Sequence, residues 1–409
     1  MMLAEANVAL IHDWLTGMRG GERCLESFCE LFPRADIFTL LHVPGSVSKT
    51  IEERRIRTSV IQALPYAATC YRYYLPLFPW AIEQFTLDGY DLIISGSHCV
   101  AKGIKPPPQA LHIAYLYTPM RYIWDMQDAY VAAGRMGPLS RLILPAVAER
   151  LRRWDVAVNA GVDHFIAISY YVADRIRRHY GREAAVIYPP VETARFYIAE
   201  RTDDYYLVAG AFAPYKRIDL AIEAFNRLRR RLVIVGEGQE GGRLRRMAGP
   251  TIEFLGRRSD REVADLLSRC RALVFPGEED FGILPVEAMA CGRPVIAYGK
   301  GGVTETVVPL NGSTFNVQRS ESKDSLAPEL RTLNLERCTP TGIFFYEQTV
   351  EALVHAVDLF ERSSDRFDPE TLRTHAFTFD RSIFEKRMMS YIGERVEEWK
   401  CKGGRRRPC

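Results

Sequence analysis

Short apolar runs alternate with helical patterns through most of the chain. Two series of these runs have the length and composition of buried strands. Those of the first half are residues 8–12, 37–41, 91–95, 112–117 and 164–169, and those of the second half are residues 206–209, 232–235, 252–255, 272–275 and 295–297. Because strands that alternate with helices usually form parallel sheets, the pattern predicts an α/β protein with two doubly wound domains.

The junction between the two series is expected at residues 186–196, where two prolines follow an apolar run and prevent a helix from continuing. We therefore predict an N-terminal domain of residues 1–188, a second domain of residues 189–380, and a C-terminal helix with a basic tail at residues 381–409. Residues 311–340 are polar and long for a connection in an α/β domain, so an inserted loop is expected there. The tail either contacts anionic lipid or is a solvated terminus.

Length, charge and cysteine content narrow the class of protein. A chain of 409 residues is longer than one compact core usually holds, which agrees with two domains. The 54 Lys and Arg against 51 Asp and Glu leave a net charge of +3, so nucleic acid is not an expected partner. The nine cysteines form no CxxC pair, so a zinc site and a disulfide framework are not expected and a reducing cytoplasm fits best.

No secretory signal or transmembrane helix is expected from the apolar segments. The N-terminus lacks a basic flank and a long apolar region, and residues 7–11 have the pattern of a first buried strand. The most apolar stretch, residues 73–82, is about half as long as a membrane span and contains two prolines.

The segment FPGEEDFGILPVEAMACGRPVIA, residues 275–297, has the pattern of a phosphate-binding site. A strand ends at Phe275, and a helix is expected to start near Gly282 with Pro285 in its first turn, where the missing N–H costs nothing. The free backbone N–H groups of Gly282, Ile283 and Leu284 would then point at an anion, which the helix dipole also favours.

Glu279 and Glu287 lie eight positions apart, one in the loop and one in the helix. Carboxylates accept hydrogen bonds from paired hydroxyls, so one Glu would suit a sugar and the other a ribose, on either side of bound phosphates. Two surface acids that cap or solubilise the helix would have the same spacing. Spacing alone leaves both interpretations open.

This segment resembles the E-x7-E motif of the retaining glycosyltransferases of family 4. The similarity continues in the neighbouring residues and extends over most of the chain, in HDWLTGMRGGER (12–23), SGSHCVAKG (95–103), TPMRYIWD (118–125), APYKRIDLAIEAF (213–225) and VGEG (235–238). The resemblance implies the GT-B fold, in which two Rossmann-like doubly wound domains face a cleft and a C-terminal helix returns to the N-terminal domain.

The resemblance also implies roles for individual residues. Glu279 and Lys216 would be catalytic residues: Glu279 would bind the donor sugar hydroxyls, and Lys216 would neutralise the diphosphate as it departs. We add His98 as a third catalytic candidate. The residues that would bind the donor are Gly20, Gly21, Lys216, Arg217, Gly256, Arg257, Glu279, Phe281, Gly282, Ile283, Leu284 and Glu287. A solvated helix start at Lys216 and Arg217 and a tight turn at Gly20 and Gly21 are the structural alternatives.

Two positions depart from the family pattern. Ala211 stands in Gly210-Ala211-Phe212 where many relatives have the arginine of Gly-Arg-Leu, and Arg217 is a candidate to compensate for it. Tyr117 stands where many relatives have the histidine of His-Thr-Pro, and a phenol does not titrate near neutral pH. His98 is therefore a candidate to face the same cleft, although a lone histidine is more often a structural group.

Aromatic and polar residues after the strand at 112–117 are candidates for binding the acceptor, since sugars stack on aromatic faces. These candidates are Tyr117, Arg121, Tyr122 and Trp124. The same stretch would also suit packing between layers. Residues 71–85 are rich in aromatics and prolines, so they either meet a membrane-bound acceptor or bury a helix hairpin.

Taken together, the resemblance implies an enzyme that moves a sugar from a nucleotide donor to a carbohydrate hydroxyl with retention, without a cofactor or metal. It is most similar to bacterial mannosyltransferases of surface polysaccharide and lipopolysaccharide assembly, which implies GDP-mannose as donor and a lipid-linked glycan as acceptor, at the cytoplasmic face of the membrane. A UDP-sugar transferase, a sugar-nucleotide epimerase and an inactive transferase-like scaffold remain alternatives.

Overall fold

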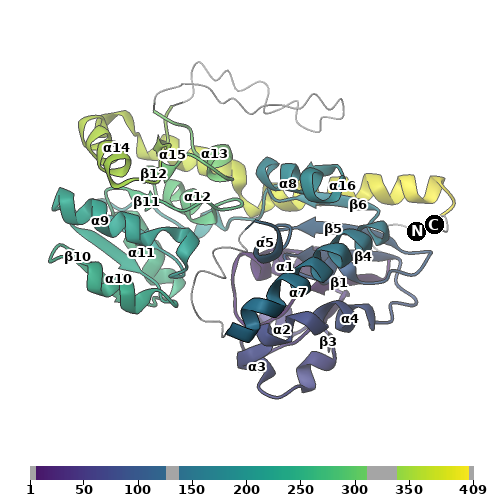
Figure 1. The fold of residues 1–409 in the computed structure, drawn as a ribbon. Helices are drawn as coiled ribbons and strands as arrows, with labels where there is room; N and C mark the ends of the chain where they lie inside the picture. The colour runs from purple at the N-terminus through teal and green to yellow at the C-terminus, as the bar shows by residue number, and fades with distance from the viewer. Residues whose placement is uncertain (1–5, 126–137, 311–338, 405–409) are drawn as a thin grey trace. The chain divides into compact units, whose positions relative to one another are not determined.

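The computed structural model describes residues 6–125, 138–310 and 339–404, and in it the chain divides into two compact units. Unit 1 comprises residues 1–190 together with 381–409, and unit 2 comprises residues 191–380. Most of the predicted inserted loop (311–340) and the end of the basic tail lie outside the described residues. Figure 1 shows both units, with labels on most of their helices and strands.

Unit 1 is built on one parallel sheet with the strand order β3-β2-β1-β4-β5-β6-β7. Its strands are β1 (Val8–His12), β2 (Asp36–Thr39), β3 (Ile56–Thr58), β4 (Leu92–Ser97), β5 (Leu111–Leu116), β6 (His164–Ala167) and β7 (Ala184–Val186). The strand order reverses direction between β1 and β4, so the loops that follow these two strands diverge at one point of the sheet's carboxyl edge.

Helices cover both faces of this sheet. They are α1 (Gly20–Leu31), α2 (Lys49–Glu52), α3 (Ala67–Cys70), α4 (Phe78–Glu83), α5 (Arg121–Trp124), α7 (Pro138–Ala157), α8 (Tyr170–Tyr180) and α16 (Arg381–Cys401). On one face, Ile11 of β1 belongs to a buried cluster with Phe78 and Ile82 of α4. On the other, the ring of Phe28 in α1 lies 5.7 Å from those of Tyr115 in β5 and Phe384 in α16.

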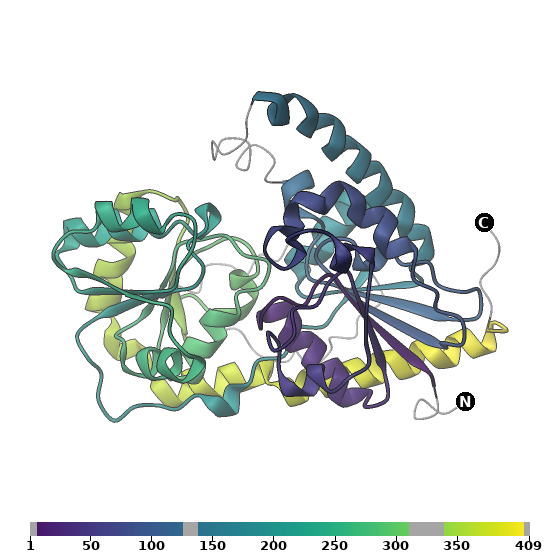
Figure 2. The same ribbon diagram turned by 90° about the horizontal axis from the view of Figure 1, so that it is seen from below.

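The C-terminal helix α16 is therefore part of unit 1, although it follows unit 2 in the sequence. Figure 2 shows it as the yellow helix that runs beside the purple α1. Arg381 at its start pairs with Glu30 of α1, and Trp399 near its end donates a hydrogen bond of 3.4 Å to the Gln109 carbonyl. The predicted return of a C-terminal helix to the N-terminal domain is confirmed.

Unit 2 repeats the architecture with the parallel strand order β10-β9-β8-β11-β12-β13. Its strands are β8 (Tyr206–Ala209), β9 (Leu232–Val235), β10 (Ile252–Gly256), β11 (Leu273–Phe275), β12 (Val295–Tyr298) and β13 (Gly342–Phe345). Its helices are α9 (Ile218–Leu228), α10 (Gly241–Met247), α11 (Asp260–Arg269), α12 (Ile283–Ala290), α13 (Val303–Thr306), α14 (Val350–Arg362) and α15 (Pro369–Ala376). The strand order reverses here between β8 and β11.

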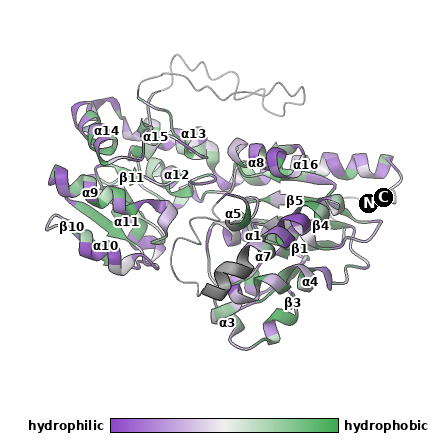
Figure 3. Cartoon of the chain, viewed as in Figure 1, coloured by the Kyte–Doolittle hydropathy of each residue, from purple (hydrophilic) through white to green (hydrophobic). Residues whose placement is uncertain are grey.

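Apolar residues are concentrated in the strands of both sheets, whereas the exposed surfaces of helices such as α10 and α16 are mostly polar (Figure 3). Together the two sheets confirm the predicted fold class of two Rossmann-like doubly wound domains. No helix in the described parts of the chain combines the length and the apolar character needed to cross a bilayer.

Candidate functional site

The carboxyl edge of the unit 2 sheet brings together the loops that carry the E-x7-E motif and the lysine segment. Strand β8 leads into the loop at residues 210–217, and the neighbouring strand β11 leads into the loop at residues 276–282. Because β8 and β11 flank the reversal of strand order, their loops open away from each other at the place where ligands bind in open α/β sheets.

Lys216 and Glu279 meet at this reversal point, although 63 positions separate them in the sequence. The Lys216 ammonium forms an ion pair with the Glu279 carboxylate, and each side chain is 20% exposed. The lysine Nζ also lies 5.9 Å from the centre of the Phe275 ring at the end of β11. The pair therefore presents one cation and one acceptor group at the edge of the sheet, partly shielded from water.

Glycines allow the neighbouring loops to approach this pair closely. A Cβ atom on Gly277 would lie 2.8 Å from the Lys216 Cα, and one on Gly236 would lie 1.9 Å from the Gly210 carbonyl oxygen. Gly236 also has a φ of +132°, which residues with a side chain rarely adopt. The loops after β8, β9 and β11 thus pack backbone against backbone.

The loop after β12 completes the edge on the other side of Glu279. The amide of Gly302 donates a hydrogen bond of 2.8 Å to the Glu279 carbonyl, and Gly301 forms an isolated parallel bridge with Glu279. A Cβ on Gly302 would lie 2.3 Å from the Asp280 carbonyl oxygen. These backbone contacts hold the acidic loop in place without using the Glu279 carboxylate.

Helix α12 starts at this edge, as predicted. Gly282 is its N-cap with a φ of +85°, and Pro285 occupies the third helical position. The amides of Ile283 and Leu284 donate to no acceptor within the described residues, as expected for the first turn of a helix. Together with Glu287, these two residues form the partly exposed stripe of an otherwise buried helix.

Two other predicted donor-binding residues have different surroundings. Phe281 is 3% exposed and its ring lies 6.0 Å from that of Phe379, so its side chain belongs to the core of unit 2. Arg217 is the N-cap of α9, and its guanidinium contacts Asp219 at 3.3 Å and Gln348 at 3.2 Å.

Gly256 and Arg257 lie at the end of β10, the edge strand of the same sheet. Gly256 has a φ of +71°, and its carbonyl accepts a 2.9 Å hydrogen bond from the Gly236 amide. Arg257 is exposed. The loops after β9 and β10 are therefore joined at the carboxyl edge.

In unit 1, the reversal of strand order is occupied by Asp13, which follows β1. Its carboxylate is fully buried and accepts hydrogen bonds of 2.7 to 3.0 Å from four successive backbone amides after β4. These amides belong to His98, Cys99, Val100 and Ala101. The loop after β4 is thus wrapped around one carboxylate from the neighbouring strand.

The predicted catalytic residue His98 also pairs with Asp13 through its side chain, with Nδ1 3.0 Å from Oδ2. Burial alone would raise the pKa of Asp13, but the charge and hydrogen bonds of His98 lower it to about 2. Burial lowers and Asp13 raises the pKa of His98, and the net shift is upward. The imidazole packs edge-on against Trp14, with ring centres 4.6 Å apart, and its side chain is 33% exposed.

Tyr117, a candidate for the acceptor site, is held inside unit 1. Its hydroxyl donates a 3.0 Å hydrogen bond to the Gly21 carbonyl, and burial raises its pKa well above the ordinary value. A tight turn before the helix, the structural alternative for Gly20 and Gly21, is not formed, because both residues lie in the first turn of α1. A Cβ on Gly21 would lie 3.2 Å from the Tyr117 ring, so close packing explains this glycine.

His12 also lies beside Gly21, since a Cβ on that glycine would be 3.4 Å from the imidazole, and it is 1% exposed. Neither of its ring nitrogens has a hydrogen-bond partner in the described parts of the chain. The Glu22 carboxylate lies 3.7 Å from Nε2 of His12 and also accepts a 3.0 Å hydrogen bond from the Arg19 amide at the start of α1.

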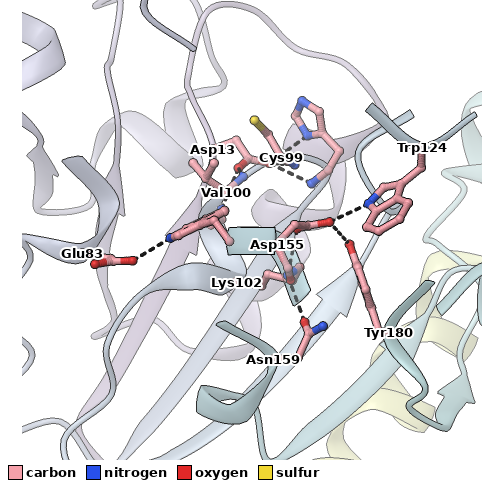
Figure 4. A network of polar contacts seen from close by, with 12 residues as sticks. Asp13, Glu83, Cys99, Val100, Lys102, Trp124, Asp155, Asn159 and Tyr180 are labelled. Carbon is pink, nitrogen blue, oxygen red and sulfur yellow. Dashed lines mark hydrogen bonds and ion pairs between the residues drawn. The ribbon is translucent and has the colours of Figure 1, made fainter. Parts of the chain in front are cut away.

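Trp124, another acceptor candidate, is tied to a buried ionic network (Figure 4). Its indole N–H and the Tyr180 hydroxyl each donate a 2.8 Å hydrogen bond to Asp155, which is fully buried. The other oxygen of Asp155 lies 2.9 Å from the ammonium of Lys102, whose pKa is lowered by burial.

Trp124 also stacks on His179, with ring centres 4.6 Å apart. The indole therefore has a clear packing role. Arg121 and Tyr122 lie in the same short helix, and Arg121 is partly buried.

Asp13 is the most important site residue that was not predicted from the sequence. Its signal is the acid that directly follows the first buried strand, at the carboxyl edge where sites of open α/β sheets lie. Gly277, Gly301 and Gly302 were also missed, and only the close approach of three loops explains them. In the described residues, no group of three or more His, Cys, Asp or Glu is arranged to hold a metal ion.

Comparison with known sequences finds similarity to glycosyltransferases. Residues 192–337 match the family model described as "Glycosyl transferases group 1". The chain is 34% identical to an uncharacterized glycosyltransferase of Methanocaldococcus jannaschii over 36% of this chain and 43% of that protein. It is 31% identical to an O-antigen chain mannosyltransferase of Salmonella typhimurium, over 32% of this chain and 41% of that protein.

A third relative, from Corynebacterium glutamicum, is a GDP-mannose-dependent monoacylated alpha-(1-6)-phosphatidylinositol monomannoside mannosyltransferase. It is 29% identical over 42% of this chain and 52% of its own length. The chain thus spans about half the length of these curated relatives.

Solved structures support the fold over nearly the whole chain. The Anabaena protein HepE, in complex with UDP-glucose, has a TM-score of 0.67 at 16% identity and covers 95% of this chain and 99% of its own. Sucrose-phosphate synthase from Thermosynechococcus elongatus also has a TM-score of 0.67, at 17% identity, and covers 96% of this chain and 100% of its own. At these identities the likeness concerns the fold.

Proposed function

We propose that this protein is a retaining glycosyltransferase that moves mannose from GDP-mannose to a hydroxyl of a lipid-linked glycan. The observation that carries the proposal is the Lys216–Glu279 ion pair at the reversal point of the unit 2 sheet, beside the first-turn amides of α12. This part of the chain lies within the match to the glycosyl transferase model.

The chemistry of this edge suits a nucleoside diphosphate sugar. A diphosphate would accept hydrogen bonds from the amides of Ile283 and Leu284 and would be attracted by the helix dipole and by the Lys216 ammonium. Glu279 would accept hydrogen bonds from sugar hydroxyls. Glu287, one turn into α12 on the same stripe, would accept from the ribose.

In the proposed reaction, the acceptor hydroxyl oxygen bonds to the anomeric carbon while the bond from that carbon to the diphosphate oxygen breaks. The proton of the hydroxyl passes to the departing phosphate. Negative charge grows on the diphosphate as the bond breaks, so Lys216 and the amides of α12 would stabilise the transition state more than the ground state.

Mannose and a lipid-linked acceptor are supported by the names of two relatives. One is an O-antigen chain mannosyltransferase, and the other is GDP-mannose-dependent and acts on a phosphatidylinositol mannoside. HepE was solved with UDP-glucose, so UDP-sugars serve as the comparison donors.

The test combines binding and turnover. Thermal unfolding is followed with GDP, UDP, GDP-mannose and UDP-glucose, because a ligand that binds only the native state raises the melting temperature. The proposal expects GDP-mannose to give the largest rise, and nuclear magnetic resonance of the product to show the donor's anomeric configuration retained. A larger rise in melting temperature with UDP-glucose would show that the donor is a UDP-sugar and not GDP-mannose. An epimerised nucleotide sugar as product would show that the protein is an epimerase. No rise with any nucleotide would overturn the proposal.

A further inference from the structure

Unit 1 exposes an unusual concentration of large apolar side chains between β3 and β4. The segment of residues 60–82, which we call the apolar helical segment, forms short helices that include α3 and all of α4 except its last residue, Glu83. It carries five of the eleven exposed large hydrophobic residues in the described parts of the chain. They are Val60, Tyr66, Tyr73, Leu77 and Trp80.

Three of these side chains are highly exposed aromatic residues that also carry a polar group. Tyr66 is 81% exposed, Tyr73 85% and Trp80 54%. Tyrosine and tryptophan combine an apolar ring with a polar group, which is why both are enriched where a membrane meets water. Scattered single hydrophobic residues on a surface need no explanation, but a cluster of this size within one short segment does.

The charge of the apolar helical segment also fits contact with a membrane surface. Residues 60–82 contain one basic residue, Arg72, and no aspartate or glutamate. A solvated helical surface usually carries charges of both signs, whereas this segment has one exposed arginine and no acid of its own, which matches a layer of anionic lipid headgroups. In a symmetric pair of chains joined through this segment, neither Arg72 would find an acid of the segment to pair with, so a second copy fits less well.

The buried side of the segment packs against Trp14, which in turn contacts His98. Tyr71 and Phe78 are buried, and their rings lie 5.1 and 6.1 Å from that of Trp14. Trp14 in turn packs against His98, with ring centres 4.6 Å apart. The exposed aromatics are therefore carried by helices whose buried side lies one side chain away from the residue paired with Asp13.

We propose that the apolar helical segment docks on an anionic phospholipid surface, with Tyr66, Tyr73 and Trp80 at the level of the headgroups and Arg72 beside lipid phosphates. Docking itself does not depend on the proposed function. Its use rests on that function, because it would bring a lipid-linked acceptor to the side of unit 1 that carries His98. A substrate that is confined to a membrane is encountered faster by a protein held on the same surface.

The test measures co-flotation of the full chain with vesicles, without donor or acceptor. Vesicles of phosphatidylcholine alone are compared with vesicles that also contain phosphatidylglycerol. We expect binding to the anionic vesicles, a loss of at least about tenfold in the Tyr73→Ser/Trp80→Ser double variant, and a reduced preference for anionic lipid in Arg72→Glu. Tyr346→Ser is the matched control, because Tyr346 of unit 2 is 64% exposed, and it is expected to bind like the original chain.

Two further measurements separate docking by this segment from binding by the basic tail and from self-association. A variant with serine at Arg405, Arg406 and Arg407 measures any contribution of the tail, and the proposal expects most binding to remain. Sedimentation velocity reports the oligomeric state. No flotation by the original chain, equal flotation by all variants, binding lost only with the tail, or a dimer dissociated by the Tyr73 and Trp80 changes would each overturn the proposal. None of these outcomes alters the nucleotide-binding test, so failure here is distinct from failure of the proposed function.

Discussion

The Asp13 carboxylate contacts His98 twice. It accepts a 2.7 Å hydrogen bond from the His98 backbone amide, and it lies 3.0 Å from Nδ1 of the imidazole ring. The same carboxylate accepts the amides of the next three residues. A single buried group therefore sets the path of the loop after β4 and the orientation of the imidazole. With Nδ1 turned to Asp13, the ring presents Nε2 on its remaining polar side.

Asp13→Asn should destabilise unit 1 strongly. The amide group has one acceptor oxygen in place of two, so its NH₂ would face backbone amides that also donate. Loss of a buried charge that is paired and hydrogen-bonded typically costs about 3 to 5 kcal/mol, and the urea midpoint should fall accordingly. Asp91→Asn is the control, since Asp91 accepts one exposed hydrogen bond, from the Asn7 amide. Equal small effects of both changes would contradict the role of Asp13.

The His98–Asp13 pair should make stability depend on pH in two windows. The pKa of Asp13 is lowered from 3.8 to about 2, so its contribution is present above pH 3.8 and is lost as pH falls towards 2. The pKa of His98 is raised from 6.5, so its contribution is complete below pH 6.5 and is lost as pH rises through the raised value. Denaturation of the original chain and of His98→Gln across pH, with a magnetic resonance titration of the imidazole, checks both. An imidazole that titrates at or below 6.5 would refute the pair's role.

Lys216→Ala and Glu279→Ala should each reduce transfer by more than about tenfold while the fold is kept, because each removes a group proposed to act on the donor. Turnover at saturating donor and the melting temperature are measured for both variants. Arg227→Ala is the matched control, because it breaks the exposed Arg227–Glu351 ion pair of 2.9 Å in the same unit. Unchanged turnover in both variants would contradict the proposed roles of Lys216 and Glu279.

Gly236→Ala should destabilise unit 2 by about 2 kcal/mol or more, because the new Cβ would overlap the Gly210 carbonyl and the backbone has a positive φ. Gly242→Ala, in the exposed part of α10, meets no atom within 4 Å and should be neutral or stabilising by up to about 1 kcal/mol. Thermal and urea unfolding of the two variants gives the comparison. A Gly236 variant as stable as the Gly242 variant would mean that the loops after β8 and β9 are not closely packed.

The buried Lys102–Asp155 pair should show strong coupling. Lys102→Met leaves an uncompensated carboxylate inside unit 1 and should cost about 3 kcal/mol or more. In a double-mutant cycle with Asp155→Asn, the combined loss should be smaller than the sum by more than about 1 kcal/mol. Lys105→Met tests an exposed pair, 2.8 Å from Glu83, and should cost less than about 1 kcal/mol. If the stability losses of the two single variants simply added in the double variant, Lys102 and Asp155 would not be energetically coupled.

Prediction from the sequence was accurate where burial is complete and failed where strands are short and lie at an edge. The runs at 206–209 and 232–235 coincide with β8 and β9, because four consecutive apolar residues leave little choice of boundary. Strand β3 has no fully buried residue, and no hydrophobic run marks it. Strand β7 also has no fully buried residue, and the sequence indicates it only as the apolar run that precedes the two prolines of the predicted junction. Strand β13, which follows the polar residues 311–340, was also not predicted.

The start of α12 at Gly282 was predictable for a local reason, since a glycine and a proline in the first turn define it. The meeting of Lys216 and Glu279 was not, because it depends on which strands become neighbours. Asp13 shows the same limit. Its four amide partners lie more than eighty positions away, and only the pairing of β1 with β4 brings them together.

The order of the elements along the chain has a consequence for how the protein is made. During synthesis, residues 191–380 emerge from the ribosome as a complete unit, whereas the core around Phe28 and Tyr115 lacks Phe384 until α16 has followed. Of the two units, unit 1 is thus begun first during synthesis and completed second. An expression fragment cut at residue 190 would lack Phe384, which packs against those two aromatic rings.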